Sequence, residues 1–204
     1  VGNVTMASGA TLTILPGTVI RVAPGAAVHC YGRLDARGTA DDPITFDRSG
    51  AGEWSGIRVQ SNNPNNVFEY VTVRGARYGI VFANATGSVS NCIVNNCSRI
   101  GVYLIGSNVT MTGNEIYGNG VCGLRLWGCN YTALTDNYIH GNGGPPDTTS
   151  TFWPGIQVLE GAVGMSCNNV ALNGGPGLML LPQGYAYAGT NAGRNKIHNN
   201  MLAD

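Results

Sequence analysis

The sequence predicts an all-β fold, a parallel β-helix in which the chain coils and each turn of the coil, or rung, supplies about three short strands. Three observations predict it. Strands that follow a glycine recur about every 22 residues, an asparagine pattern recurs in step with them, and no segment places apolar residues at helical spacing over three turns. We therefore expect a single domain over residues 1–204 with eight to nine rungs and almost no helix.

The N-terminal third is the least regular part of the predicted helix. The stretch "ATLTILPGTVIRVAPGAAVHCYGRLDARG" alternates apolar and polar residues and is interrupted by two Pro-Gly pairs and a Tyr-Gly pair. Such alternation with Gly/Pro punctuation is typical of short strands joined by turns. The first rungs are therefore expected here.

The repeat becomes regular after this region. Six glycines each precede a strand of one pattern, namely "IRVQ", "IVFA", "VYLI", "LRLW", "IQVL" and "LMLL". These glycines are Gly56, Gly79, Gly101, Gly123, Gly155 and Gly177, spaced by 23, 22, 22, 32 and 22 residues. The one long spacing indicates an insertion loop at about 143–154.

A second pattern, Asn-x-[Ile/Val]-x-x-Asn, occurs five times in the same register. Asparagine tolerates left-handed backbone and bonds to nearby backbone groups, so it suits turns. Identical turns stacked on one another would form asparagine ladders. The predicted ladder residues are Asn91, Asn96, Asn114, Asn119, Asn137, Asn142, Asn168, Asn173, Asn195 and Asn200.

Alternation within each strand predicts which side chains face outward. The first and third residues after each repeat glycine are apolar in all six strands, which assigns them to the core. The second and fourth residues face outward and become mostly apolar from Tyr103 onward. The predicted interface or sugar-binding surface comprises Tyr103, Ile105, Arg125, Trp127, Leu159, Met179 and Leu181, with Trp153 of the insertion loop.

A contiguous apolar patch usually marks an interface, and three interpretations of this one remain open. The insertion loop, with Phe152 and Trp153, folds over it; a second copy or another protein binds it; or it binds a sugar, with Trp127 stacking and Arg125 hydrogen bonding. The third strand of each rung presents a different outward group, and Glu115, Tyr117, Tyr138 and His140 are expected to cluster there. A general base oriented by a carboxylate is one interpretation; a solvated polar face is the one we favour.

Composition limits the classes of function. Charged residues make up 11% of the chain, against roughly 25% in ordinary soluble domains. The formal net charge is zero, which argues against a nucleic-acid or anionic-membrane partner and favours self-association. No run of about 20 apolar residues predicts a membrane span, and no signal peptide is expected in the sequence.

The six cysteines form no Cys-x-x-Cys pair, so we expect no zinc site. The eleven acidic residues are thinly spread and do not gather the several carboxylates of a calcium site, so we expect no other metal, and we expect no cofactor. Positions near neighbouring turns predict two candidate disulfides, Cys97–Cys122 and Cys129–Cys167, and inward parity predicts Cys30 as a buried thiol. Cysteine number and the uncharged surface together favour an oxidising, extracellular setting.

The opening "GATLTILPGTVIRVAPGAAVHCYGRLDARGTADDPITFDRS", followed by "GEWSGIRV", resembles the first rungs of bacterial secreted and cell-surface right-handed parallel β-helix proteins. These belong to the pectin-lyase-like superfamily, and the resemblance covers essentially the whole chain. It implies a right-handed coil and says little of function, because this fold carries lyases, hydrolases, adhesins, tailspikes and inert rods.

The motifs of polysaccharide-cleaving relatives are imperfect in this chain. "LTDN", "IHGN" and "RNKI" only approximate the polygalacturonase-like set, and the single Asp-Asp pair, Asp41–Asp42, lies far away. No two carboxylates obviously converge as glycoside hydrolysis requires. We therefore expect an extracellular, non-catalytic structural or adhesive element that assembles through its ends, its apolar side, or both. The alternative is a polysaccharide-binding or polysaccharide-cleaving protein that uses the Arg125/Trp127 surface.

Overall fold

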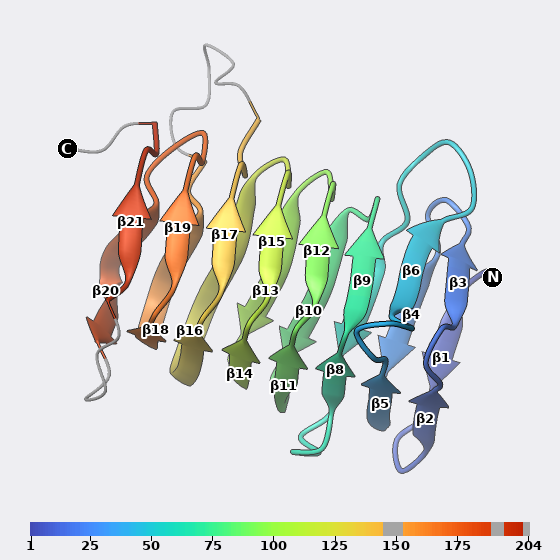
Figure 1. Ribbon diagram of the computed structural model, residues 1–204. Coiled ribbons are helices and arrows are strands. Elements are labelled where there is room, and N and C mark those ends of the chain that lie inside the picture. The colour runs from blue at the N-terminus through green and yellow to red at the C-terminus, as the bar shows by residue number, and fades with distance from the viewer. Residues whose placement is uncertain (145–152, 189–193, 202–204) are drawn as a thin grey trace.

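The computed structural model is a solenoid of stacked parallel strands, and it describes residues 1–144, 153–188 and 194–201. Every strand pairs in parallel with its counterpart one rung away (Figure 1). Partner residues in the regular part differ by 22 positions, as in Ile80, Val102 and Leu124. The predicted parallel β-helix is confirmed, with eight rungs counted along its third strand column, and the described residues contain no helix.

The strands form three columns along the solenoid. The first column begins with β1 (Val4–Met6), β4 (Ala27–Cys30), β7 (Gly56–Val59), β10 (Tyr78–Ala83) and β13 (Ile100–Ile105). The second column begins with β2 (Thr11–Ile14), β5 (Arg33–Arg37), β8 (Val67–Glu69), β11 (Thr86–Ser90) and β14 (Asn108–Thr112). In the last three rungs one bent strand serves both columns: β16 (Cys122–Thr135), β18 (Ile156–Ser166) and β20 (Leu178–Ala188).

The third column is a separate eight-stranded sheet that faces the viewer in Figure 1. Its strands are β3 (Val19–Val22), β6 (Ile44–Arg48), β9 (Val71–Arg74), β12 (Ile93–Asn95), β15 (Glu115–Tyr117), β17 (Tyr138–His140), β19 (Asn169–Ala171) and β21 (Lys196–His198). Adjacent rungs are separated by about 4.8 Å, the ordinary strand spacing. Side chains one rung apart therefore stand within contact distance along the whole face.

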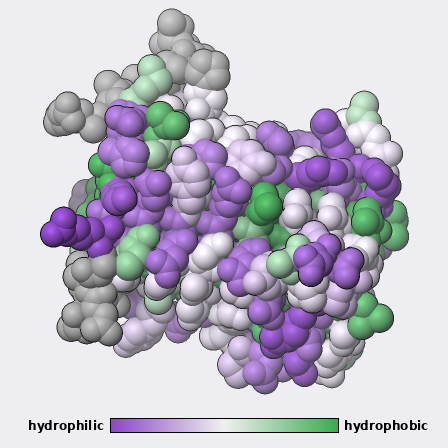
Figure 2. Space-filling model, in the orientation of Figure 1, coloured by the Kyte–Doolittle hydropathy of each residue, from purple (hydrophilic) through white to green (hydrophobic). Residues whose placement is uncertain are grey.

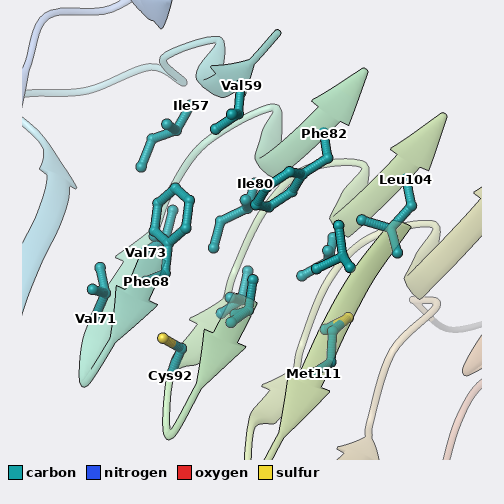
Figure 3. Close-up of a cluster of buried hydrophobic side chains, with 14 of the residues drawn as sticks. Ile57, Val59, Phe68, Val71, Val73, Ile80, Phe82, Cys92, Leu104 and Met111 are labelled. Atoms are coloured by element: carbon teal, nitrogen blue, oxygen red, sulfur yellow. The ribbon is translucent and has the colours of Figure 1, made fainter. Parts of the chain in front are cut away.

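The core is a set of side-chain stacks inside the coil. Ile57, Ile80, Val102 and Leu124 follow one another in register and are fully buried. Figure 3 shows such side chains from the three columns pointing into one interior. Of the predicted inward residues, Leu178 is only partly buried and Leu180 is 44% exposed, because both lie on β20, the last described strand of its column.

Asparagine ladders run through two buried turns of the C-terminal half. In each ladder, the side-chain oxygen of one asparagine accepts two hydrogen bonds from the asparagine of the previous rung, one from its backbone N–H and one from its side-chain amide. Asn114, for example, donates both to Oδ1 of Asn137, at 3.1 and 2.8 Å. The two ladders are Asn114–Asn137–Asn168–Asn195 and Asn119–Asn142–Asn173–Asn200.

The prediction that Asn91 and Asn96 belong to these ladders was wrong. Both side chains are exposed, and both residues adopt left-handed backbone, with φ of 52° and 51°. The strand register places them beside Gly113 and Gly118, one position before the ladder residues. They supply the left-handed bend that later rungs obtain from Gly113, Gly118 and Gly141 and from the non-glycine residues Asp136, Cys167, Leu172 and Asn199.

Cysteines take the ladder positions of that rung instead. The backbone N–H groups of Cys92 and Cys97 donate to the side-chain oxygens of Asn114 and Asn119, at 2.9 and 3.0 Å. Burial raises the pKa of both thiols to about 12. The ladders therefore end on buried, protonated thiols.

All six cysteines are free, so the predicted disulfides Cys97–Cys122 and Cys129–Cys167 are not present. Five of the thiols are buried in the interior of the coil, and Cys167 alone of the six is exposed, where it forms a left-handed bend with φ of 56°. The cysteines consequently lend no support to an oxidising compartment.

Candidate functional site

The predicted binding surface lies on the outward side of the first strand column, and we call it the Trp127 face. The strand register arranges it in two neighbouring columns of side chains. One column is Tyr103, Arg125, Gln157 and Met179, and the other is Ile105, Trp127, Glu160 and Gln183.

Trp127 is the prominent residue of this face, with 49% of its surface exposed. Its indole N–H donates a hydrogen bond to Oε2 of Glu160 on the next rung, at 3.2 Å. This hydrogen bond already fixes the orientation of the ring, which remains half exposed. Stacking on a flat, partly apolar ligand therefore costs little further side-chain entropy.

Arg125 packs beside the tryptophan over Tyr103, with its guanidinium carbon 5.9 Å from the centre of the tyrosine ring. Burial raises the pKa of the Tyr103 phenol, and the positive charge of Arg125 offsets part of that rise. Arg125 Nε and Gln157 Oε1 are both buried without a hydrogen-bond partner in the described structure. Neighbouring rungs therefore hold one donor and one acceptor that the protein itself does not satisfy.

The face is less apolar than predicted, because a β-bulge changes its register. Trp127 pairs with Glu160, so Leu159 becomes the extra residue instead of standing beside the tryptophan. A second shift, between Val158 and Glu160, leaves Leu181 of β20 without a partner residue on β18. The signal that sequence reasoning missed is Gly161, whose φ of +96° allows the irregular backbone.

Trp153 does not join the Trp127 face. Its backbone and Cβ lie against Gly143 and Gly175, at the turns that lead from the third column back to the first. Most of the predicted insertion loop, including Phe152, lies outside the described residues.

The outward side of the third column carries the second predicted cluster. Its face is mainly hydrophilic in Figure 2. His140 stacks on Tyr138 of its own strand and on Tyr117 of the previous rung, with ring centres 3.9 and 5.1 Å apart. His140 Nε2 lies 3.1 Å from Oε1 of Glu115.

This arrangement orients the imidazole as the general-base interpretation requires, and it equally forms a rigid aromatic platform. The side-chain contacts of this cluster extend one rung further toward the N-terminus, because the Asn95 amide donates to the Tyr117 hydroxyl at 2.8 Å. Across the described residues no group of three or more His, Cys, Asp or Glu side chains is arranged to hold a metal ion, and no helix is long and apolar enough to cross a membrane.

Comparison with known proteins agrees with this architecture. The family described as "Right handed beta helix region" matches residues 55–203. Among solved structures, the full-length tailspike protein 2 of Escherichia coli O157:H7 bacteriophage CAB120 superimposes with a TM-score of 0.53 at 17% sequence identity. That match covers 82% of this chain and 28% of the tailspike, and at this identity it shows the fold alone.

No curated protein matches the sequence. The family match nevertheless covers well over half of the chain and agrees with the strand topology. The chain belongs to the right-handed β-helix family.

Proposed function

We propose that the protein is an extracellular adhesive element that binds a polysaccharide on the Trp127 face. The observation that carries the proposal is the half-exposed indole of Trp127, held at its edge by Glu160. Sugar rings have apolar faces that stack on aromatic rings and hydroxyl groups that both donate and accept hydrogen bonds. Arg125 Nε and Gln157 Oε1, once a small side-chain rotation exposes them, suit such hydroxyls.

Binding without cleavage is the activity that this face supports better. Glycoside hydrolysis uses two carboxylates about 5–10 Å apart. In the described part of the two columns Glu160 is the carboxylate beside Trp127, and it already accepts a hydrogen bond from the indole. The low charge of the chain is consistent with a ligand recognised mainly by stacking and hydroxyl contacts.

Affinity electrophoresis through gels that contain neutral or acidic polysaccharides tests the proposal. We expect at least one polysaccharide to retard the protein, and Trp127→Ala to weaken that binding at least about tenfold. Tyr131→Ala is the matched control, because Tyr131 is a 77%-exposed aromatic residue on the same strand, outside the two columns. Equal binding by the wild type and Trp127→Ala would refute the proposal.

A second candidate, end-to-end assembly, is favoured by the two ends of the described solenoid. At the first rung an apolar hollow of about 360 Å³ opens among Val4, Leu12, Ile14 and Ile20. At the last rung Leu180 and Tyr185 are 44% and 59% exposed. Among the described strands, those of the first and last rungs pair on one side only, and such edges with apolar side chains beside them suit head-to-tail docking of copies, which generates open filaments.

Light scattering and electron microscopy of the concentrated protein test this assembly. We expect concentration-dependent association and fibres, both reduced by Ile197→Asp, since Ile197 is 47% exposed on β21. A monodisperse monomer at high concentration without fibres excludes the second candidate and leaves the binding proposal intact.

A further inference from the structure

A hollow lined by three arginines lies on the outward side of the third column, away from the Trp127 face. Arg21 pairs in register with Asp47, and the register places Arg74 next along the same column. The hollow has a volume of about 460 Å³. Its lining residues are Arg21, Asp47, Arg48, Ser49, Gly50, Arg74, Gly75 and Asn96.

The hollow carries an excess of positive charge that the protein does not neutralise. Asp47 is already engaged, because Oδ2 lies 2.9 Å from Nη2 of Arg74 and Oδ1 accepts the backbone N–H of Arg48 at 2.8 Å. The guanidinium groups of Arg21 and Arg48 have no carboxylate partner among the described residues. Three cations against one carboxylate leave a formal charge of +2 in one concave site.

The backbone gives Arg48 room to lie along the hollow. A Cβ at Gly75 would meet Cγ and Cδ of Arg48 at 3.3 and 3.2 Å. Gly75 also has φ of +68°, a conformation that side chains rarely adopt. The stem of Arg48 therefore packs over a glycine, and its charged end remains exposed beside Arg74 and Asn96.

We propose that this arginine hollow binds an oxyanion group, a sulfate, phosphate or carboxylate, carried on a molecule of about monosaccharide size. A guanidinium presents a planar fork of donors that matches an oxyanion in bidentate geometry, and two unpaired forks stand at this site. The volume is within the range of small-molecule sites, roughly 300–1,000 Å³. Polar groups of Ser49 and Asn96 line the same hollow for hydroxyl contacts. The site is separate from the Trp127 face and does not depend on the function proposed for it.

The test is isothermal titration of the full chain at low salt with glucose 6-sulfate, glucuronic acid, inorganic sulfate and neutral glucose. We expect at least one anionic probe to bind at least about tenfold more tightly than glucose, with affinity that falls as salt is raised. Tighter binding of a charged sugar than of inorganic sulfate supports the proposal and identifies an acidic saccharide. Tight binding of inorganic sulfate alone supports the oxyanion chemistry and overturns the inference that a molecule of about monosaccharide size carries it.

Variants separate this site from general attraction between charges. Arg21→Gln and Arg48→Gln should each lower the affinity for the anionic probe at least about tenfold. Arg99→Gln removes an exposed arginine outside the hollow and should leave affinity unchanged, as should Trp127→Ala. The side chains are exposed, so folding should be retained, which a thermal melt checks. Equal loss in Arg99→Gln, unchanged binding in Arg48→Gln, or no preference for anions over glucose would overturn the proposal.

Discussion

Replacing Asn114 by aspartate tests whether the buried ladder stabilises the solenoid. Asn114 is 1% exposed, and its side-chain amide donates to the Val89 carbonyl at 2.9 Å and to Oδ1 of Asn137 at 2.8 Å. Aspartate keeps the shape and the oxygen that accepts the Cys92 N–H, and it replaces the donor by a second acceptor. Two favourable contacts therefore become acceptor–acceptor contacts.

The expected cost follows from those two contacts. Loss of the two hydrogen bonds costs about 1 kcal/mol net for each, and the new aspartate oxygen, buried without a donor, costs about 1–3 kcal/mol more. We expect Asn114→Asp to lower the free energy of unfolding by about 4 kcal/mol, which corresponds to roughly 8–16 °C in melting temperature for a chain of this size. The matched control is Asn91→Asp, expected to change stability by less than about 0.5 kcal/mol. Its exposed left-handed position is occupied by Asp136 two rungs on.

The effect should also depend on pH. Burial raises the pKa of an introduced carboxyl group above its unfolded value of about 3.9. Below that pH the carboxyl is protonated in both states and can donate one hydrogen bond, so the deficit is smallest. The loss in free energy of unfolding, relative to the wild type, grows as pH rises from the pKa of the unfolded state toward the pKa of the folded state. Urea denaturation of both variants at pH 4 and pH 8 measures it, and equal stability of Asn114→Asp and Asn91→Asp at pH 8 would refute the reasoning.

Three further predictions follow from the interior of the coil. Because Cys167 is exposed and the other five thiols are buried, native protein at pH 8 should react with one equivalent of a thiol reagent, and denatured protein with six; rapid reaction of more than one native thiol would count against the buried arrangement. Burial raises the pKa of Cys30 and Cys122 from 9.0 to about 12, so stability present below pH 9 should be lost as pH rises from 9 to 12, and a urea midpoint unchanged between pH 8 and pH 11 would contradict this. Gly161→Ala should destabilise by about 2–4 kcal/mol in urea denaturation, because φ is +96° and the new Cβ would lie 2.0 Å from the Cys129 carbonyl oxygen. Gly50→Ala, whose new Cβ meets no described atom within 4 Å, should change stability by less than about 0.5 kcal/mol.

The fold was largely predictable because its determinants are periodic. A 22-residue spacing of glycines and apolar pairs is sufficient to predict stacked rungs, and the side-chain parity placed Leu124 and Leu126 correctly in the core. The position of the ladders was less predictable for Asn91 and Asn96. The left-handed bend and the ladder occupy adjacent positions in each turn, and asparagine suits both positions. The sequence pattern alone therefore does not show which of the two positions an asparagine fills.

The surfaces were harder to predict, because they depend on irregularities. One extra residue at the bulge replaces Leu159 by Glu160 beside Trp127, and parity counting from Gly155 cannot detect it. The arginine hollow joins Arg21, Arg48 and Arg74 from the least regular rungs, where spacings depart from 22 residues and no repeat aligns them. The cluster around His140 was predicted, because it lies in the regular part.

The most direct test of polysaccharide binding on the Trp127 face is an NMR titration that follows the tryptophan indole N–H signals. The chain has three tryptophans: Trp54 is fully buried, Trp153 lies at the turns, and Trp127 is half exposed on the proposed face. Substitution of each tryptophan by phenylalanine assigns the three signals. On addition of the polysaccharide that retards the protein, we predict a saturable shift of the Trp127 signal with the other two unchanged; a Trp127 signal that stays in place while the polysaccharide binds would contradict the proposed site.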